Sequence, residues 1–76
     1  MELQRVFGKV IKELRSQKKL SQEKLAFDSD IDRTYISDIE KGDRNVSLLI
    51  IHRIAKALQI SLSDLFKKIE DYGEIK

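Results

Sequence analysis

The sequence predicts an all-α fold, a compact domain of five short helices. Apolar residues recur at intervals of three and four, and no stretch of a strand's length alternates apolar and polar residues. Ser or Asp also stands just before four of the five expected helices, where it can cap the first turn. The 76 residues are too few for a second core, and without cysteine there is no disulfide framework. We therefore expect residues 1–76 to form a single domain.

The first two helices are expected over residues 3–17 and 22–29. Residues 3–17 place basic and apolar side chains on opposite faces. Ser21 is a good N-cap for the second helix, from which Leu25 and Ala26 face inward. The apolar face of the first helix consists of Leu3, Val6, Phe7, Val10, Ile11 and Leu14.

The third helix is expected over residues 33–41. Asp32 is its N-cap, and Gly42 stands where a left-handed residue ends a helix. Ile36 and Ile39 face inward. The turn before this helix has no glycine, so we expect Asp30 to adopt the left-handed conformation that Asp visits more readily than most residues.

The last two helices follow Ser47 and Ser61. Ser47 caps the fourth helix, and Ser61 with Asp64 three residues later resembles a capping box that opens the fifth, at about residues 62–71. The inner stripe of the fourth helix is Leu48, Ile51, Ile54, Ala55 and Leu58, and one side of the fifth carries Leu62, Leu65, Phe66 and Ile69.

The formal net charge of +2 is unevenly distributed. Residues 1–20 contain six Lys or Arg and two Glu, which gives +4, whereas the rest of the chain is slightly acidic. A basic end indicates a surface that faces a polyanion, although exposed helix faces are also commonly charged.

The second and third helices are short and about three residues apart, which is typical of a helix-turn-helix that places its second helix in the major groove of DNA. At about 100° per residue, the polar side chains of the third helix lie opposite Ile36 and Ile39. Arg can bind guanine through two hydrogen bonds, and Ser and Thr can reach base edges or phosphates. The predicted reading residues are Arg33, Thr34, Ser37 and Lys41.

Five neighbouring residues extend this surface. Gln22, in the first turn of its helix, is placed to donate to a phosphate. Tyr35 either contacts phosphate through its hydroxyl or is only a rim aromatic, and Arg44 and Asn45 either continue the contact surface or are solvated loop residues. Asp38 is acidic on a DNA-facing surface. It either accepts from a cytosine amino group or repels nonspecific DNA.

Three segments make the sequence similar to a known family. Residues 20–26 (LSQEKLA), 33–42 (RTYISDIEKG) and 54–58 (IAKAL), together with Arg44 and Asn45, resemble the Cro and lambda repressor-like helix-turn-helix family. The resemblance covers residues 10–66. Residues 32–37 (DRTYIS) and the short length are most similar to the controller proteins of restriction-modification systems.

The resemblance implies a homodimer that binds a palindromic, double-stranded DNA operator and regulates transcription. A controller protein first activates its own gene and that of the endonuclease, which makes RNA polymerase a further partner, and represses as it accumulates. In the family pattern, Arg33, Thr34, Tyr35 and Ser37 match the operator-reading helix, and Gln22 matches the phosphate contact. Arg44 and Asn45 match the adjoining backbone contacts. The resemblance also implies a structural ion pair between Arg15 and Glu40.

The fourth and fifth helices carry more apolar surface than the core of one small domain needs. We expect a second copy of the chain to bury this apolar surface. Alternatively, the fifth helix only closes the core of the monomer. The expected dimer interface consists of Leu49, Ile50, Leu62, Leu65, Phe66 and Ile69.

Other functional classes have little support. The sequence has no cysteine or glycine-rich phosphate loop, and His52 has no nucleophile at helical spacing. We expect no enzymatic activity, cofactor or metal, and no membrane span, which favours the cytoplasm. An antitoxin or a phage-type repressor with the same fold remains the alternative.

Overall fold

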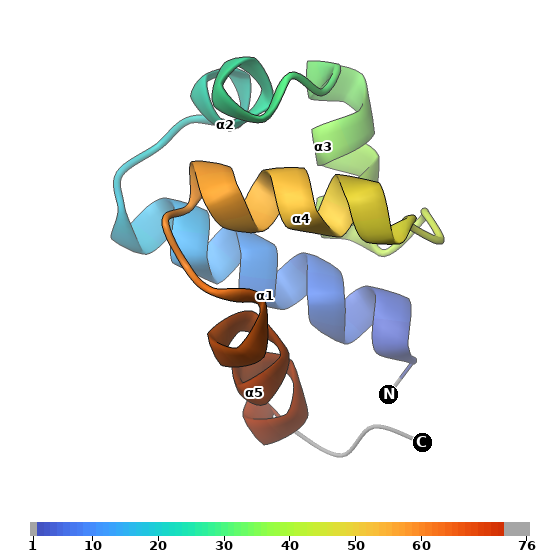
Figure 1. Cartoon of the computed structure of the whole chain (residues 1–76). Helices are drawn as coiled ribbons and strands as arrows, with labels where there is room; N and C mark the ends of the chain where they lie inside the picture. Colours follow the sequence, from blue (N-terminus) through green and yellow to red (C-terminus); the bar gives the residue numbers. More distant parts are fainter. Residues whose placement is uncertain (1, 73–76) are drawn as a thin grey trace.

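The computed structural model describes residues 2–72, which form five helices (Figure 1). Within these residues there is no strand, so the predicted all-α class is confirmed. The first three helices match the expected ranges, the fourth begins after Ser47 as expected, and the fifth ends one residue later than expected. The helices are α1 (Leu3–Gln17), α2 (Gln22–Ser29), α3 (Arg33–Lys41), α4 (Leu48–Ala57) and α5 (Leu62–Tyr72).

The four predicted caps are formed by side-chain oxygens. Each oxygen accepts from a backbone N–H in the first turn, which would otherwise have no partner in the helix. These signals are local in the sequence, which explains why the helix starts were predictable. The acceptors and donors are Ser21 and Lys24, Asp32 and Thr34, Ser47 and Ile50, and Ser61 and Asp64.

The turn between α2 and α3 depends on Asp30. Its φ of 57° and ψ of 45° confirm the predicted left-handed conformation. After this turn, the N–H of Ile31 donates to the carbonyl oxygen of Ala26 at 3.0 Å. Ile31 is buried there, so the turn is fixed to the core as well as to α2.

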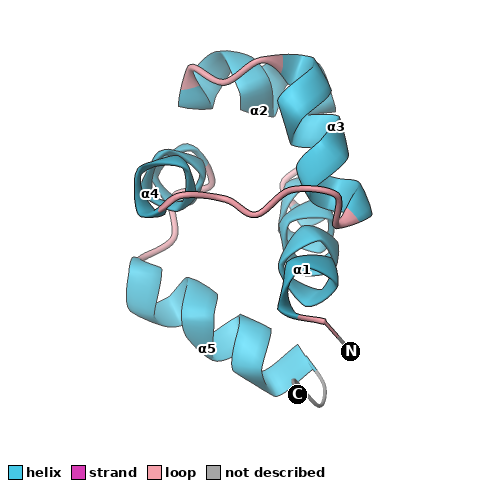
Figure 2. Ribbon diagram, turned by 90° about the vertical axis from the view of Figure 1, so that its right-hand side faces the viewer, coloured by secondary structure: helices cyan, strands magenta, loops and turns pink. Residues whose placement is uncertain are grey.

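The helices surround one hydrophobic core. α1 packs against α3 and α5, whereas α2 packs against α3 and α4. The helix-turn-helix therefore lies at one end of the molecule and α5 at the other, with α1 and α4 between them (Figures 1 and 2). The largest fully buried side chains come from all five helices and are Val6, Ile11, Leu25, Ile36, Ile39, Ile54, Leu58, Leu65 and Ile69.

Two residues predicted to face the core are exposed instead. Leu48 is 80% exposed and Leu3 is 53% exposed, so their inward assignments are wrong. Each is the first residue of its helix. Because helical side chains tilt toward the N-terminus, those of the first residues extend past the end of the core.

None of the helices described combines the length and the apolar composition needed to span a bilayer.

Candidate nucleic-acid interface

One face of α3 is buried and the other is open. Ile36 is 0% and Ile39 1% exposed, which anchors the helix in the core. On the opposite face, Arg33, Thr34 and Lys41 are exposed, and Ser37 is half-buried. The four predicted reading residues are thus accessible, on a helix whose orientation is fixed from behind.

The residues beside this face form a cluster of three side chains, which we call the Tyr35–Asp38–Arg44 cluster. The guanidinium of Arg44 lies 4.8 Å from the centroid of the Tyr35 ring. The same group donates to Oδ2 of Asp38, from Nη2 at 3.1 Å and from Nε at 3.3 Å. Tyr35 itself is half-buried and packs against the core. Asp38 therefore has a partner within the protein, which the sequence pattern did not reveal.

Gly42 brings Arg44 back over α3. Its φ of 81° is in the left-handed region, where glycine is favoured. The chain reverses, and the N–H of Asp43 donates to the carbonyl oxygen of Asp38 at 2.9 Å. A Cβ on Gly42 would also lie 2.8 Å from Cγ of Arg5. The exposed Asn45 follows, so both predicted loop contacts lie near the C-terminal end of α3.

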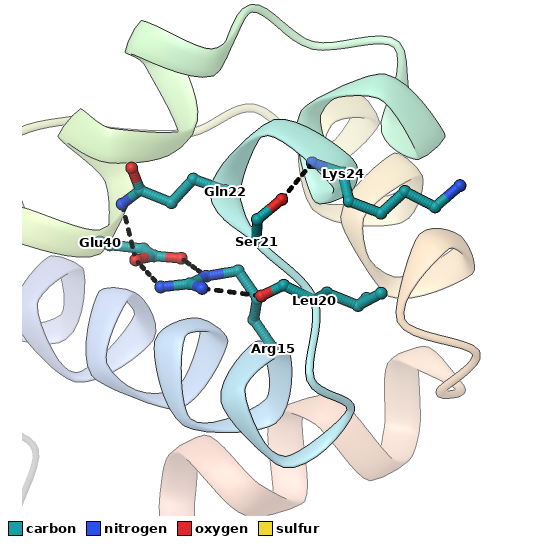
Figure 3. A network of polar contacts seen from close by, with 6 residues as sticks. All are labelled: Arg15, Leu20, Ser21, Gln22, Lys24 and Glu40. Atoms are coloured by element: carbon teal, nitrogen blue, oxygen red, sulfur yellow. Dashed lines mark hydrogen bonds and ion pairs between the residues drawn. The ribbon is translucent and has the colours of Figure 1, made fainter.

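A buried ion pair holds the other side of α3 (Figure 3). Nε of Arg15 donates to Oε2 of Glu40 at 2.7 Å, and Nη2 donates to Oε1 at 3.0 Å. The two side chains are only 13% and 4% exposed. Nη1 of Arg15 donates to the carbonyl oxygen of Leu20 at 2.8 Å. One side chain of α1 thereby fixes both α3 and the segment that leads into α2.

The hydrogen bond to Glu40 raises the pKa of Arg15 above its ordinary value, and burial opposes this change less strongly. Because the pKa is raised on folding, the stabilisation through the charge of Arg15 is lost only as the pH rises through that pKa. For an arginine this loss lies beyond ordinary working conditions. Arg15 therefore does not act as a pH switch.

Gln22 is connected to the same ion pair. Its Nε2 donates to Oε1 of Glu40 at 3.0 Å, so its side chain lies over the pair (Figure 3). An amide nitrogen carries two hydrogens, and one N–H therefore remains for a phosphate oxygen. The predicted phosphate contact is compatible with this position, but no pattern in the sequence indicated the bond to Glu40.

Gly8, inside α1, is a further residue that positions the interface and was not among those predicted from the sequence. A Cβ at this position would overlap the carbonyl oxygen of Ile39 and would lie 2.8 Å from that of Glu40. The backbones of α1 and α3 thus touch where Gly8 lies. A glycine inside a helix costs about 1 kcal/mol relative to alanine, and this cost was the one signal available in the sequence.

The predicted interface residues do not all lie on the surface. Leu49 is 58%, Leu62 40% and Phe66 39% exposed. Ile50 is half-buried and packs against the core. Leu65 and Ile69 are 0% and 2% exposed, so the expectation that they contact a partner is wrong. Both face α1 and α4 rather than solvent, since those helices cover that side of α5.

Phe66 shares a hollow with the first turn of α1. The hollow has a volume of about 170 Å³ and is also lined by Leu3, Val46 and Arg44. The exposed apolar side chains of α1 and α5 therefore lie close together.

Residues 2–72 contain no group of three or more His, Cys, Asp or Glu side chains that could hold a metal ion.

Comparisons with known proteins agree with this geometry. A family model described as "Helix-turn-helix" matches residues 11–65. The control protein C.BamHI of Bacillus amyloliquefaciens is 54% identical over 61 residues, which cover 79% of this chain and 75% of that protein. The control protein C.MunI of Mycoplasma sp is 52% identical over 65 residues, which cover 84% and 88%.

Among solved structures, a restriction-modification controller protein has nearly the same fold. The C.Esp1396I tetramer in complex with its natural 35 base-pair operator superposes with a TM-score of 0.88 and 37% sequence identity. The match covers 93% of this chain and 93% of that one.

Proposed function

The chain belongs to the Cro and lambda repressor-like helix-turn-helix family of DNA-binding transcription regulators, and we propose that it is a restriction-modification controller protein that binds a palindromic operator as a homodimer. The observation that carries the proposal is the open face of α3. Its exposed side chains can donate to base edges, while Ile36 and Ile39 fix the helix from the core side.

Each residue of the interface has a proposed role. Arg33, Thr34, Ser37 and Lys41 read base edges in the major groove. Contacts to phosphates fix the register of the protein on the duplex but carry no sequence information directly. We assign these to the residues around α3, namely Gln22, Tyr35, Arg44 and Asn45.

We also propose the regulation that is characteristic of controller proteins. The dimer first activates its own gene and the endonuclease gene, in contact with RNA polymerase, and represses when a second site is filled. The named relatives are control proteins, and one of them is described as a tetramer on a single operator, which supports this order of events.

Replacing Arg33 with alanine tests the reading role. From a pool of duplexes with a randomised centre, the wild type should enrich a palindrome whose half-sites are centred about 34 Å or a multiple of it apart. Arg33→Ala should bind the enriched duplex about 5- to 150-fold more weakly for each half-site and lose preference at one base pair of each half-site, because a bidentate contact contributes about 1–3 kcal/mol. Fluorescence anisotropy on the enriched and a shuffled duplex measures both effects.

Arg33→Lys is the matched control, since lysine keeps the positive charge but lacks the planar guanidinium that makes the bidentate contact. It should retain binding to the shuffled duplex and still lose the base preference. Equal losses on both duplexes for Arg33→Ala would refute base reading by this residue.

Phe66→Glu should produce monomers. Phe66 is a large apolar side chain at the surface of α5, and a charge there would be desolvated by a second copy. Leu65→Glu would not be informative, because Leu65 is in the core and the protein would unfold. Phe27 is 81% exposed on α2, at the opposite end of the molecule, so Phe27→Glu is the control. Sedimentation equilibrium should show a dimer for Phe27→Glu. A dimer of unchanged affinity for Phe66→Glu would argue against this interface.

A further inference from the structure

Asp38 needs an explanation on a surface that faces DNA. It lies four residues after Thr34 and three before Lys41, so it shares the open face of α3. Its side chain is 26% exposed. A carboxylate among phosphates is repelled by them, and a residue with no role there would lower the affinity for every sequence.

The contacts of Asp38 indicate what the carboxylate does. Among residues 2–72, its side-chain partner is Arg44, which it binds through one oxygen, Oδ2. Arg44 is 50% exposed, so it extends into solvent beyond the ion pair. It also stacks on Tyr35, whose ring is held by the core. Two contacts at different angles therefore restrict a long side chain that is otherwise free to rotate.

An unrestrained arginine beside α3 would favour any DNA. Its charge would attract the nearest phosphate, and phosphates lie along every duplex whatever its sequence. Pairing with Asp38 opposes this attraction, because a move toward a phosphate breaks the pair. The N–H groups of Arg44 that Asp38 does not bind stay free. The pair holds them in one position, where they can bind a duplex whose shape fits that position.

We propose that Asp38 is a specificity-determining residue, which holds Arg44 over Tyr35 in position for one phosphate of the operator and keeps it from swinging to the nearest phosphate of other DNA. This inference rests on the proposed function. Asp38 acts through Arg44, as a positioning residue, and contacts no base itself.

The expected effect is moderate because the ion pair is partly exposed. Loss of such a pair changes an equilibrium by about threefold in each subunit, and by about tenfold in a dimer. Asp38→Asn removes the charge with little change in shape. It should reduce the ratio of operator to random-DNA affinity about tenfold, mainly by strengthening binding to random DNA.

The experiment measures both affinities by fluorescence anisotropy, on the duplex enriched by the wild type and on a shuffled duplex of equal length, over a range of KCl concentrations. On the shuffled duplex, the slope of log affinity against log salt should steepen by about 1 per subunit, as Arg44 gains a phosphate contact. Thermal unfolding should be nearly unchanged, since Asp38 and Arg44 are partly exposed.

Asp43→Asn is the matched control. It removes the same charge from the neighbouring loop, where the exposed Asp43 has no side-chain bond to Arg44 within the described residues. It should strengthen binding to both duplexes equally, so the ratio stays the same. In an Arg44→Ala background, Asp38→Asn should likewise leave the ratio unchanged, because there is no guanidinium to hold.

Each outcome decides the matter. The inference is overturned if Asp38→Asn changes the ratio no more than Asp43→Asn does, or if its effect persists without Arg44. A wild type that enriches no duplex would contradict the proposed function itself and not only the role of Asp38.

Discussion

Replacing Arg15 with methionine is expected to lower the free energy of unfolding by about 3–5 kcal/mol. The change leaves the carboxylate of Glu40, only 4% exposed, without its counter-charge. It also removes the donor to the carbonyl oxygen of Leu20. Native proteins have a total stability of about 5–15 kcal/mol, so this loss is a large fraction of the stability available. Urea denaturation followed by circular dichroism measures the loss.

The ion pair between Lys24 and Asp28 offers a matched control. Lys24 and Asp28 are 3.0 Å apart on α2, but their side chains are 56% and 29% exposed. Lys24→Met should therefore cost at most about 0.5 kcal/mol. The double variant Arg15→Met with Glu40→Leu should recover most of the loss, because it removes both charges. If Arg15→Met costs no more than Lys24→Met, the buried pair does not stabilise α3 as described.

Replacing Gly8 with alanine is expected to cost about 3 kcal/mol, at the upper end for overpacked cores. The new methyl group would overlap the carbonyl oxygens of Ile39 and Glu40. These are backbone atoms, which cannot rotate away as a side chain would, so α1 and α3 must separate. The displacement would move the whole reading face, and operator affinity should fall together with stability.

The measurement is again urea denaturation, with anisotropy on the enriched duplex as the second readout. Lys9→Ala, at the neighbouring exposed position, should change stability by less than about 0.5 kcal/mol. In an ordinary helix interior, glycine to alanine stabilises by about 1 kcal/mol. A gain of that kind for Gly8→Ala would show that α1 and α3 do not touch there.

The sequence predicted what short-range chemistry determines. Ser21, Asp32 and Ser47 each cap the helix that begins next to them, so its start depends on a few neighbouring residues. The left-handed conformation of Asp30 was predictable because the turn contains no glycine and Asp tolerates this conformation better than most residues. The exposed face of α3 also followed from the helical period alone.

What the sequence could not predict depends on how the helices pack against each other. Leu65 and Phe66 are adjacent apolar residues, yet one is buried and the other is at the surface, because α1 and α4 cover only part of α5. The pairing of Asp38 with Arg44 requires the reversal at Gly42, which brings a loop residue over α3. Periodicity within one helix carries no information on such contacts.

The placement of the helix-turn-helix and of α5 on opposite sides of α1 has a consequence for how such regulators diverge (Figure 2). In the proposed assembly, substitutions on the outer face of α3 can give a new target sequence while α5, and with it the pairing of subunits, stays as it was. The spacing between the two half-sites is then inherited, since α1 and α4 lie between α3 and α5 and fix the distance between them. In the proposed assembly, related chains in one cell can thus recognise different promoters with the same scaffold.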